Sequence, residues 1–333
     1  MRKAHRYKII FMGGNLLGCM CLKELLRRRN IEIVTVVGRY GDNGSVVDPK
    51  AWNASLLRLA MEKQLPFIQP KNAKSKKFWE ELYQLEKPDF ILSVQYDKIL
   101  GHELLNYPEA GCVKIRYAVL PHDSGNFPIP WALIEKKPIG VTIHWMDDSI
   151  DSGDIIVSKE VDVKPNDTAF SLYHKVTTEA FKLFKKYFPL ILEKKAPRIS
   201  QSENSKISHA ISYPHDRNID WEWKAHKIDR MVRALTFPSF PSARTYFKDL
   251  EVEILNPVEI VSNDKNGFKP GQVIDIQPSG FIVQTEENSI LVSKVRVNES
   301  LTMNATKFSQ QFKLAIGDIF QRKAEEKNLQ VVI

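Results

Sequence analysis

Short apolar runs alternate with amphipathic stretches through the first half of the chain. Residues 8–12 form an apolar run that predicts a strand, and the turn Gly13-Gly14-Asn15 follows it directly. A helical pattern then runs from Leu17 to Arg28, and Ile31 to Val37 is a β-branched stretch that predicts a second strand. This order of strand, glycine turn, helix and strand is typical of the opening of a doubly wound α/β sheet.

The same alternation continues to about residue 192. A long helix is expected after Asp167-Thr168, because these residue types cap helix N-termini. Residues 155–163 alternate between apolar and polar side chains, which favours an edge strand at this point. We predict further helices over 52–64 and 74–85 and further strands over 67–68, 88–94, 111–115 and 140–146.

The pattern changes after residue 195. Residues 196–218 are rich in Pro, Ser and Asn and indicate a linker, and residues 220–235 have a helical pattern. The five short alternating stretches beyond it predict a small barrel or twisted sheet; they cover 243–247, 252–254, 271–276, 280–285 and 289–295. We therefore expect one domain over 1–195, a linker over 196–218 and a β-rich domain over 219–333.

The composition is typical of a globular protein and gives no sign of a membrane or secreted protein. The chain of 333 residues is 43% hydrophobic and 26% charged, as expected for a globular protein with room for two domains. It has no apolar run long enough to cross a bilayer and no secretory signal pattern, so we expect a cytoplasmic protein without a membrane partner. Three cysteines without metal-ligand spacing predict neither a disulfide framework nor a metal site. The net charge of +8 suits an anionic partner or a solvated basic surface.

The early glycines do not fit a dinucleotide-binding motif. Gly13, Gly14 and Gly18 lack the Gly-x-Gly-x-x-Gly spacing, and Gly38-Arg39 stands where an acidic residue would end the second strand. The structural interpretation is an ordinary strand-to-helix turn, in which small residues are needed. The functional alternative is a helix N-terminus that receives a phosphate or carboxylate of the substrate.

Several blocks occur together in the order of a known family. In the N-terminal part the blocks are Phe11-Met12-Gly13, Asp89–Leu100, Leu120-Pro121 with Gly125 and Pro128, Gly140-Val-Thr, and Asp151-Ser-Gly-Asp154. In the C-terminal part they are Ile219-Asp220-Trp221 and residues 232–241. In this order, the chain resembles the folate-dependent formyltransferases that act on methionyl-tRNA and on aminosugars, and its C-terminal part is most similar to the aminosugar-modifying members.

The resemblance implies a Rossmann-like formyltransferase domain followed by a small β-rich, OB-like barrel. It implies N10-formyltetrahydrofolate as the cofactor and Asp151 as the acid/base residue. The implied cofactor-binding residues are Val94, Tyr96, Ile99, Leu100 and Asp154. The substrate-binding candidates are Gly13, Gly14, Asn15, Gly125, Asn126 and Phe237.

The chain departs from the family at the catalytic strand. Where the family has Asn-x-His, this chain has Lys114-Ile-Arg116, and Ser124 replaces an Arg of the family. Formyl transfer to an amine needs a donor for the tetrahedral oxyanion and a base for the amine proton. Arg stays protonated, and Lys can act as a base only if burial or nearby cations lower its pKa.

Two strand residues with one residue between them, such as Lys114 and Arg116, point to the same side. We therefore expect Lys114 and Arg116 to pair with Asp151, which gives a cationic pocket suited to an anion. His122 and His144 are candidate replacements for the lost base, and Asn126 is a candidate amide donor.

Three functions follow from these residues. The first is N-formyl transfer to a nucleotide-linked aminosugar, which the likeness at Arg233-Ala-Leu-Thr favours. We expect no nucleic-acid partner, because residues 243–297 contain no interleaved basic and aromatic stripe, and methionyl-tRNA is less favoured as the substrate. The second is a catalytically degenerate member that binds a ligand or regulates. The third is a repurposed transferase that uses Lys114 and Arg116 to hold an anion. The sequence leaves a homodimer open.

Overall fold

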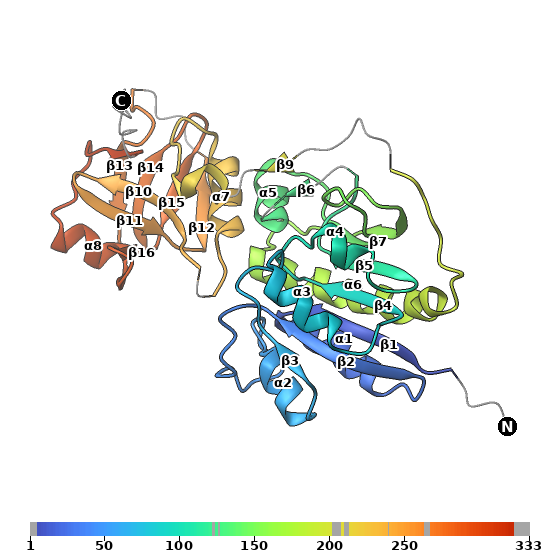
Figure 1. Ribbon diagram of the computed structural model, residues 1–333. Coiled ribbons are helices and arrows are strands. Elements are labelled where there is room, and N and C mark those ends of the chain that lie inside the picture. The colour runs from blue at the N-terminus through green and yellow to red at the C-terminus, as the bar shows by residue number, and fades with distance from the viewer. Residues whose placement is uncertain are drawn as a thin grey trace, which may run out of the picture. The chain divides into compact units, whose positions relative to one another are not determined.

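The protein consists of two compact units (Figure 1). The computed structural model describes residues 5–121, 124–125, 127–201, 208–209, 213–238, 240–262 and 267–322. One unit comprises Met1–Pro128, Pro138–Asp162 and Tyr173–His209. The other comprises Ile129–Lys137, Val163–Leu172 and Ala210–Ile333.

The first unit is built on a seven-stranded sheet with the strand order β3-β2-β1-β4-β5-β7-β8. The first five strands of this order are parallel, and β7 and β8 join antiparallel at one side. The predicted doubly wound α/β sheet is therefore confirmed, with β8 as the predicted edge strand. The strands are β1 (Tyr7–Gly13), β2 (Ile31–Gly38), β3 (Phe67–Ile68), β4 (Phe90–Val94), β5 (Gly111–Arg116), β7 (Gly140–Trp145) and β8 (Ile155–Glu160).

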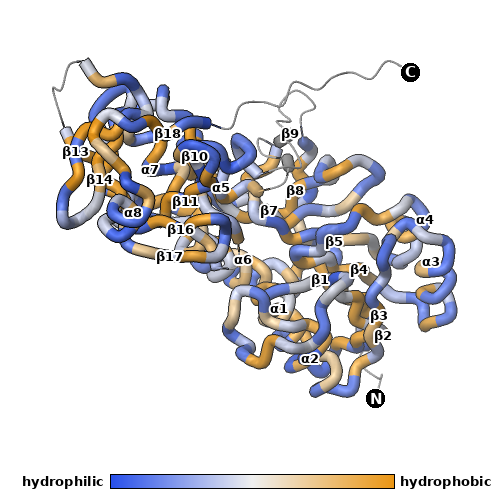
Figure 2. The backbone as a smooth tube through the Cα atoms, turned by 90° about the vertical axis from the view of Figure 1, so that its left-hand side faces the viewer, coloured by the Kyte–Doolittle hydropathy of each residue, from blue (hydrophilic) through white to orange (hydrophobic). Residues whose placement is uncertain are grey.

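The central strands are buried because helices cover the sheet. Every residue of β4 is buried, as expected for a parallel strand inside an α/β unit. One core cluster joins Ile10, Met12 and Ile91 of the sheet to Phe78 and Leu82 of the helix α3. In Figure 2, stretches of hydrophobic residues fall on strands of the sheet, and many of the connections between elements are hydrophilic. The helices are α1 (Asn15–Leu26), α2 (Leu56–Glu62), α3 (Lys76–Tyr83), α4 (His102–Leu105) and α6 (Ala169–Leu192), whose first turn belongs to the second unit.

Of two predicted helix starts, that of α2 was wrong and that of α6 is confirmed. The helix expected from residue 52 begins at Leu56, because the Ser55 hydroxyl accepts the Arg58 N–H at 3.0 Å and so caps the helix there. The prediction of its N-terminus was wrong by four residues. The long helix does begin after Asp167-Thr168, where the Thr168 hydroxyl accepts the Ser171 N–H at 3.2 Å.

The second unit contains two antiparallel sheets. Their strand orders are β17-β16-β11-β10-β18 and β12-β15-β14-β13. This confirms the predicted β-rich C-terminal domain. The strands are β10 (Ala243–Phe247), β11 (Leu250–Ile254), β12 (Val258–Val261), β13 (Val273–Gln277), β14 (Gly280–Gln284), β15 (Ser289–Val292), β16 (Lys294–Val297), β17 (Leu301–Asn304) and β18 (Phe320–Gln321). Its helices are α5 (Pro128–Glu135), the 3-10 helix η2 (Pro214–Arg217), α7 (Ala225–Ala234) and α8 (Ala305–Gln311).

One strand expected here is two strands. The apolar stretch 289–295 breaks at Ser293, because β15 pairs with β14 and β12 in one sheet whereas β16 pairs with β11 in the other. The helix expected over 220–235 begins only at Ala225, because the Asp220 side chain and carbonyl accept the N–H groups of Glu222 and Trp223 in a turn. Neither departure shows in a hydropathy pattern.

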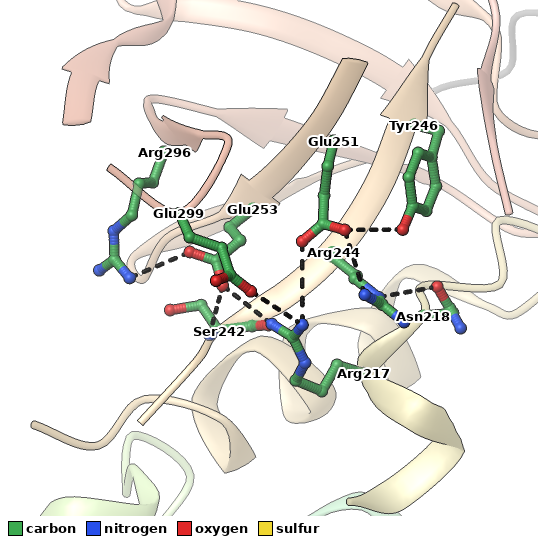
Figure 3. A network of polar contacts seen from close by, with 9 residues as sticks. All are labelled: Arg217, Asn218, Ser242, Arg244, Tyr246, Glu251, Glu253, Arg296 and Glu299. Atoms are coloured by element: carbon green, nitrogen blue, oxygen red, sulfur yellow. Dashed lines mark hydrogen bonds and ion pairs between the residues drawn. The ribbon is translucent and has the colours of Figure 1, made fainter. Parts of the chain in front are cut away.

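A buried glutamate stabilises the second unit (Figure 3). The Glu253 side chain is 1% exposed, and its two oxygens accept from Arg217 and Arg296 at 3.0 Å each. The Ser242 N–H also donates to this carboxylate at 3.0 Å. These contacts compensate the cost of burying the charge. They also fasten Arg217, which lies in the stretch that the sequence indicates as a linker, to β11 and β16.

Candidate active site

Strand β5 presents two cations on one side of the sheet. Lys114 and Arg116 are separated by one residue, and both reach the carboxylate of Asp151. The neighbouring antiparallel strand β7 places His144 opposite Lys114 and Thr142 opposite Arg116. The expected pairing of both cations with Asp151 is confirmed.

The loop between β7 and β8 supplies Asp151. Its backbone is in the left-handed region, with φ at 55°, which is uncommon for a residue with a side chain. Gly153 follows where a Cβ would lie 2.0 Å from the Trp145 carbonyl oxygen, so only glycine fits. The Trp145 N–H donates to the Asp154 carbonyl at 2.9 Å and closes the loop. The Asp-Ser-Gly-Asp block is thus a tight turn that aims one carboxylate at β5.

The four side chains form one buried cluster. Lys114 Nζ lies 2.9 Å from Asp151 Oδ1, and the Arg116 guanidinium contacts Oδ2 of the same carboxylate. His144 Nε2 lies 3.6 Å from Asp151 Oδ1. The Asp151 side chain is 4% exposed and that of His144 1%, whereas that of Lys114 is 20% exposed. Lys114 is therefore the member of this cluster most open to a substrate.

Burial and charge set the protonation of the cluster. Burial first, and the Arg116 guanidinium second, lower the pKa of Lys114 to about 8. Burial, together with the charges of Lys114 and Arg116, lowers the pKa of His144 to about 3, against the opposing effect of its hydrogen bond to the Trp145 carbonyl. His144 is consequently neutral at pH 7. Its Nδ1 lies 2.7 Å from that carbonyl oxygen, so Nδ1 carries the proton and Nε2 is left as an acceptor.

The Gly-Val-Thr block anchors the loop that follows β5. The Thr142 hydroxyl donates to the Ala118 carbonyl at 2.7 Å and accepts the Leu120 N–H at 3.1 Å. At Gly140 a Cβ would lie 2.1 Å from the Lys159 carbonyl oxygen, so β7 can approach β8 only through glycine. This block is therefore explained by packing around the cluster.

The expected cofactor-binding residues differ in exposure. Val94, Tyr96 and Leu100 are buried, whereas the Ile99 side chain is 51% exposed. Burial raises the pKa of the Tyr96 phenol, and its hydroxyl has no hydrogen-bond partner among the described residues. Asp154 lies 3.5 Å from Arg198 and accepts from the Ser200 hydroxyl at 3.3 Å.

The expected substrate-binding residues fall in three places. At Gly13 and Gly14 a Cβ would meet the Val94 carbonyl oxygen at 2.9 Å and the Arg39 side chain at 2.5 Å. The N–H of Leu16, in the first turn of α1, donates to the Trp52 carbonyl at 3.1 Å and is therefore already satisfied. Asn15 opens α1 with φ at 57°, and Gly125 pairs with His209 in the short β6–β9 ladder of Ser124–Gly125 and Ser208–His209.

The remaining candidates lie elsewhere in the chain. Phe237 belongs to the second unit, where its ring packs edge-on against Phe170 and Phe240. His122 and Asn126 lie outside the described residues.

One contact to the Asp151 loop was not predicted from the sequence. Gln201 Nε2 donates to the carbonyls of Asp151 at 3.0 Å and of Gly153 at 2.6 Å. Gln201 stands in the Ser- and Pro-rich stretch that indicates a linker, fifty positions after Asp151. A lone Gln in such a stretch carries no pattern that could place it here.

Across the described part of the chain, no group of three or more His, Cys, Asp or Glu side chains could hold a metal ion. Nor is any helix within those residues both long and apolar enough to span a membrane.

Two known protein families match this chain. Residues 8–187 match the family described as "Formyl transferase", and residues 212–313 match "Formyl transferase, C-terminal domain". The chain belongs to the formyltransferase family.

Individual relatives cover nearly the whole chain. A methionyl-tRNA formyltransferase of Clostridioides difficile is 31% identical over 87% of this chain and 92% of its own length. One from Desulforamulus reducens is 29% identical over 94% of this chain and 97% of its own length.

Solved structures of other formyltransferases are similar to this chain as well. A 4-N formyltransferase from Francisella tularensis is 25% identical, with a TM-score of 0.59 over 72% of this chain and 92% of its own. An N-formyltransferase from Helicobacter canadensis, solved with folinic acid and dTDP-3-aminofucose, is 20% identical. It has a TM-score of 0.65 over 86% of this chain and 98% of its own, a likeness that supports the fold.

Proposed function

We propose that this protein transfers a formyl group from N10-formyltetrahydrofolate to a primary amine, with Lys114 as the general base. The observation that carries the proposal is the lowered pKa of Lys114, about 8, at the place of the family's catalytic strand. With this pKa, the neutral amine of Lys114 forms much more readily near neutral pH than that of an ordinary lysine. Arg116 cannot act as a base, and His144, with a pKa of about 3, is a weak one.

The residues present fit a folate. The Tyr96 hydroxyl is buried without a partner among the described residues, and the side chain of nearby Ile99 is exposed. When bound, the cofactor supplies an activated formyl carbon with a nitrogen leaving group. Val94 and Leu100 would contribute backbone and loop shape at this end of β4, and Asp154 would contribute from the loop before β8, as the family resemblance implies.

Each member of the cluster then has one task. The neutral Lys114 amine takes the proton of the attacking amine as the new C–N bond forms, and it returns that proton to the leaving nitrogen as the old C–N bond breaks. The Arg116 guanidinium donates to the formyl oxygen as negative charge develops on it. Asp151 holds both cations in place and balances one of their charges. The products are a formamide and tetrahydrofolate.

Two acceptors have support. Relatives that match this chain over almost their full length are methionyl-tRNA formyltransferases, which favours methionyl-tRNA. The preference for a nucleotide-linked aminosugar rests on the likeness at Arg233-Ala-Leu-Thr and on the sugar N-formyltransferases among similar structures. The relatives therefore weaken the expectation that nucleic acid is not a partner, and both acceptors belong in the first assay.

The test is formyl transfer measured with each acceptor at saturating N10-formyltetrahydrofolate. We expect kcat/KM to rise about tenfold per pH unit below pH 8 and to level off above it, because the base must be unprotonated. Replacing Lys114 by Met should lower kcat/KM by about a hundredfold or more. No transfer to either acceptor at any pH would sink the proposal.

One observation favours binding without turnover. The Asp151 carboxylate is held by two cations at once, so it is not free to relay a proton. The double change Lys114→Asn with Arg116→His restores the family's residues and separates the two functions. A gain of transfer would mean that the natural site binds without catalysing, whereas a loss would mean that Lys114 and Arg116 carry the reaction.

A further inference from the structure

A short segment after α6 contacts the Asp151 loop at several points. This segment, residues 197–201, is called the strap below. Ile199 forms an antiparallel bridge to Ile155 at the start of β8, with N–H to carbonyl distances of 2.8 and 3.0 Å. The strap therefore extends the sheet edge next to the loop that carries Asp151.

The strap also binds the side chains around the loop. The Arg198 guanidinium lies over the Trp145 ring at 4.1 Å and pairs with Asp154 at 3.5 Å. The Trp145 indole N–H donates to the Pro197 carbonyl at 3.4 Å. These contacts fix the end of β7 and the end of the loop, but they do not touch Asp151 itself.

Gln201 makes that last contact. Its amide nitrogen donates one hydrogen to the Asp151 carbonyl and the other to the Gly153 carbonyl, at 3.0 and 2.6 Å. Asp151 has a left-handed backbone with φ at 55°, a conformation that persists only where the surroundings determine it. An amide that spans residues 151 and 153 is suited to hold such a turn closed.

We propose that Gln201 is a positioning residue, which through the strap holds the Asp151 carboxylate against Lys114 and Arg116. This inference rests on the proposed function, in which that carboxylate sets the charge around the base. If the two hydrogen bonds are removed, the loop relaxes and Asp151 withdraws. Lys114 then stays beside Arg116 without its 2.9 Å counter-ion.

The test replaces Gln201 by Glu, which keeps the size of the side chain but removes both donors and places an anion against two carbonyls. Gln201→Ala is the second variant, since it removes the donors without adding repulsion. Gln284→Glu is the matched control. Gln284 lies in the second unit and also donates from its amide to two carbonyls, those of Thr285 at 2.8 Å and Asn288 at 3.1 Å.

The decisive measurement does not need turnover. Competitive labelling with acetic anhydride, read by mass spectrometry, gives the pH midpoint at which Lys114 becomes reactive. We expect the midpoint to fall by about half a pH unit or more in both Gln201 variants, because a cation that loses its counter-ion gives up its proton more easily. The Gln284→Glu protein should keep the midpoint of the unaltered protein. An unchanged or raised midpoint in the folded Gln201 variants would overturn the proposal.

Kinetics supply a second readout. If the protein transfers formyl groups, Gln201→Glu should lower kcat about tenfold or more and change KM for the folate by less than about threefold, because the strap acts on the reacting cluster. If the unaltered protein shows no transfer, the proposed function fails while the labelling still decides the role of Gln201. An equal effect of Gln201→Glu and Gln284→Glu on kcat would count against a positioning role.

Discussion

Asp151 is the carboxylate that both cations of β5 contact. Replacing Asp151 by Asn keeps its shape but removes the negative charge beside Lys114 and Arg116. We expect a loss of roughly 3 kcal/mol in the free energy of unfolding, because an uncompensated buried charge is costly. Urea denaturation at pH 7 measures this loss.

Asp154 in the same loop is the control for that change. Its side chain is 32% exposed and pairs with the partly exposed Arg198, so Asp154→Asn should cost less than about 1 kcal/mol. Equal losses for the two variants would mean that the cluster around Asp151 contributes no more than an ordinary surface pair.

His144 makes stability depend on pH. Its pKa is about 3 in the folded protein and about 6.5 when unfolded, so between these values the unfolded chain binds the extra proton. Stability is therefore lost as pH falls below 6.5, by about 2 kcal/mol between pH 7 and pH 5. A His144→Gln protein should lose about 2 kcal/mol less over the same interval. Urea denaturation at both pH values tests this, and parallel losses in the two proteins would contradict it.

At the scale of elements, two glycines have opposite roles. Gly140 opens β7 where a Cβ would lie 2.1 Å from the Lys159 carbonyl oxygen of β8, so Gly140→Ala must separate the two strands. We expect a loss of more than about 2 kcal/mol in unfolding free energy, of the size caused by overpacking. Gly18 lies inside α1 with only ordinary contacts near 3.6 Å, so Gly18→Ala should be neutral or stabilise by up to about 1 kcal/mol. Denaturation curves that show similar losses for both would be inconsistent with this packing.

A hydropathy pattern predicted some of the elements but not all of their boundaries. Each strand of the first unit's main sheet was predictable, because its central strands need continuous apolar runs and its edge strand β8 alternates between apolar and polar residues. The start of α2 was not, because the Ser55 cap and not the apolar period decides where that helix begins. The break at Ser293 was not predictable either, since both of its halves are apolar and only strand partners distinguish them.

At the scale of the whole molecule, ligand binding should be visible as stability. A ligand that binds only the folded protein adds about 2.7 kcal/mol at a concentration of a hundred times its Kd. We expect folinic acid to raise Tm, because the residues around Tyr96 and Ile99 fit a folate. Thermal unfolding with folinic acid, with a dTDP-linked aminosugar and with initiator tRNA compares the candidate ligands. No rise with folinic acid would remove the folate from the proposed reaction.

The sequence by itself determined the fold class and the β-rich second half, because burial enforces apolar periodicity. The resemblance of its motifs to the formyltransferases singled out Lys114, Arg116 and Asp151, and alternation on a strand put residues 114 and 116 on one side. Only the tertiary structure decided what surrounds them. It brought His144 opposite Lys114 through β-sheet register, and it brought Gln201 from fifty positions away onto the Asp151 loop. It also set the pKa of Lys114, because burial and the neighbouring guanidinium exist only when the chain is folded.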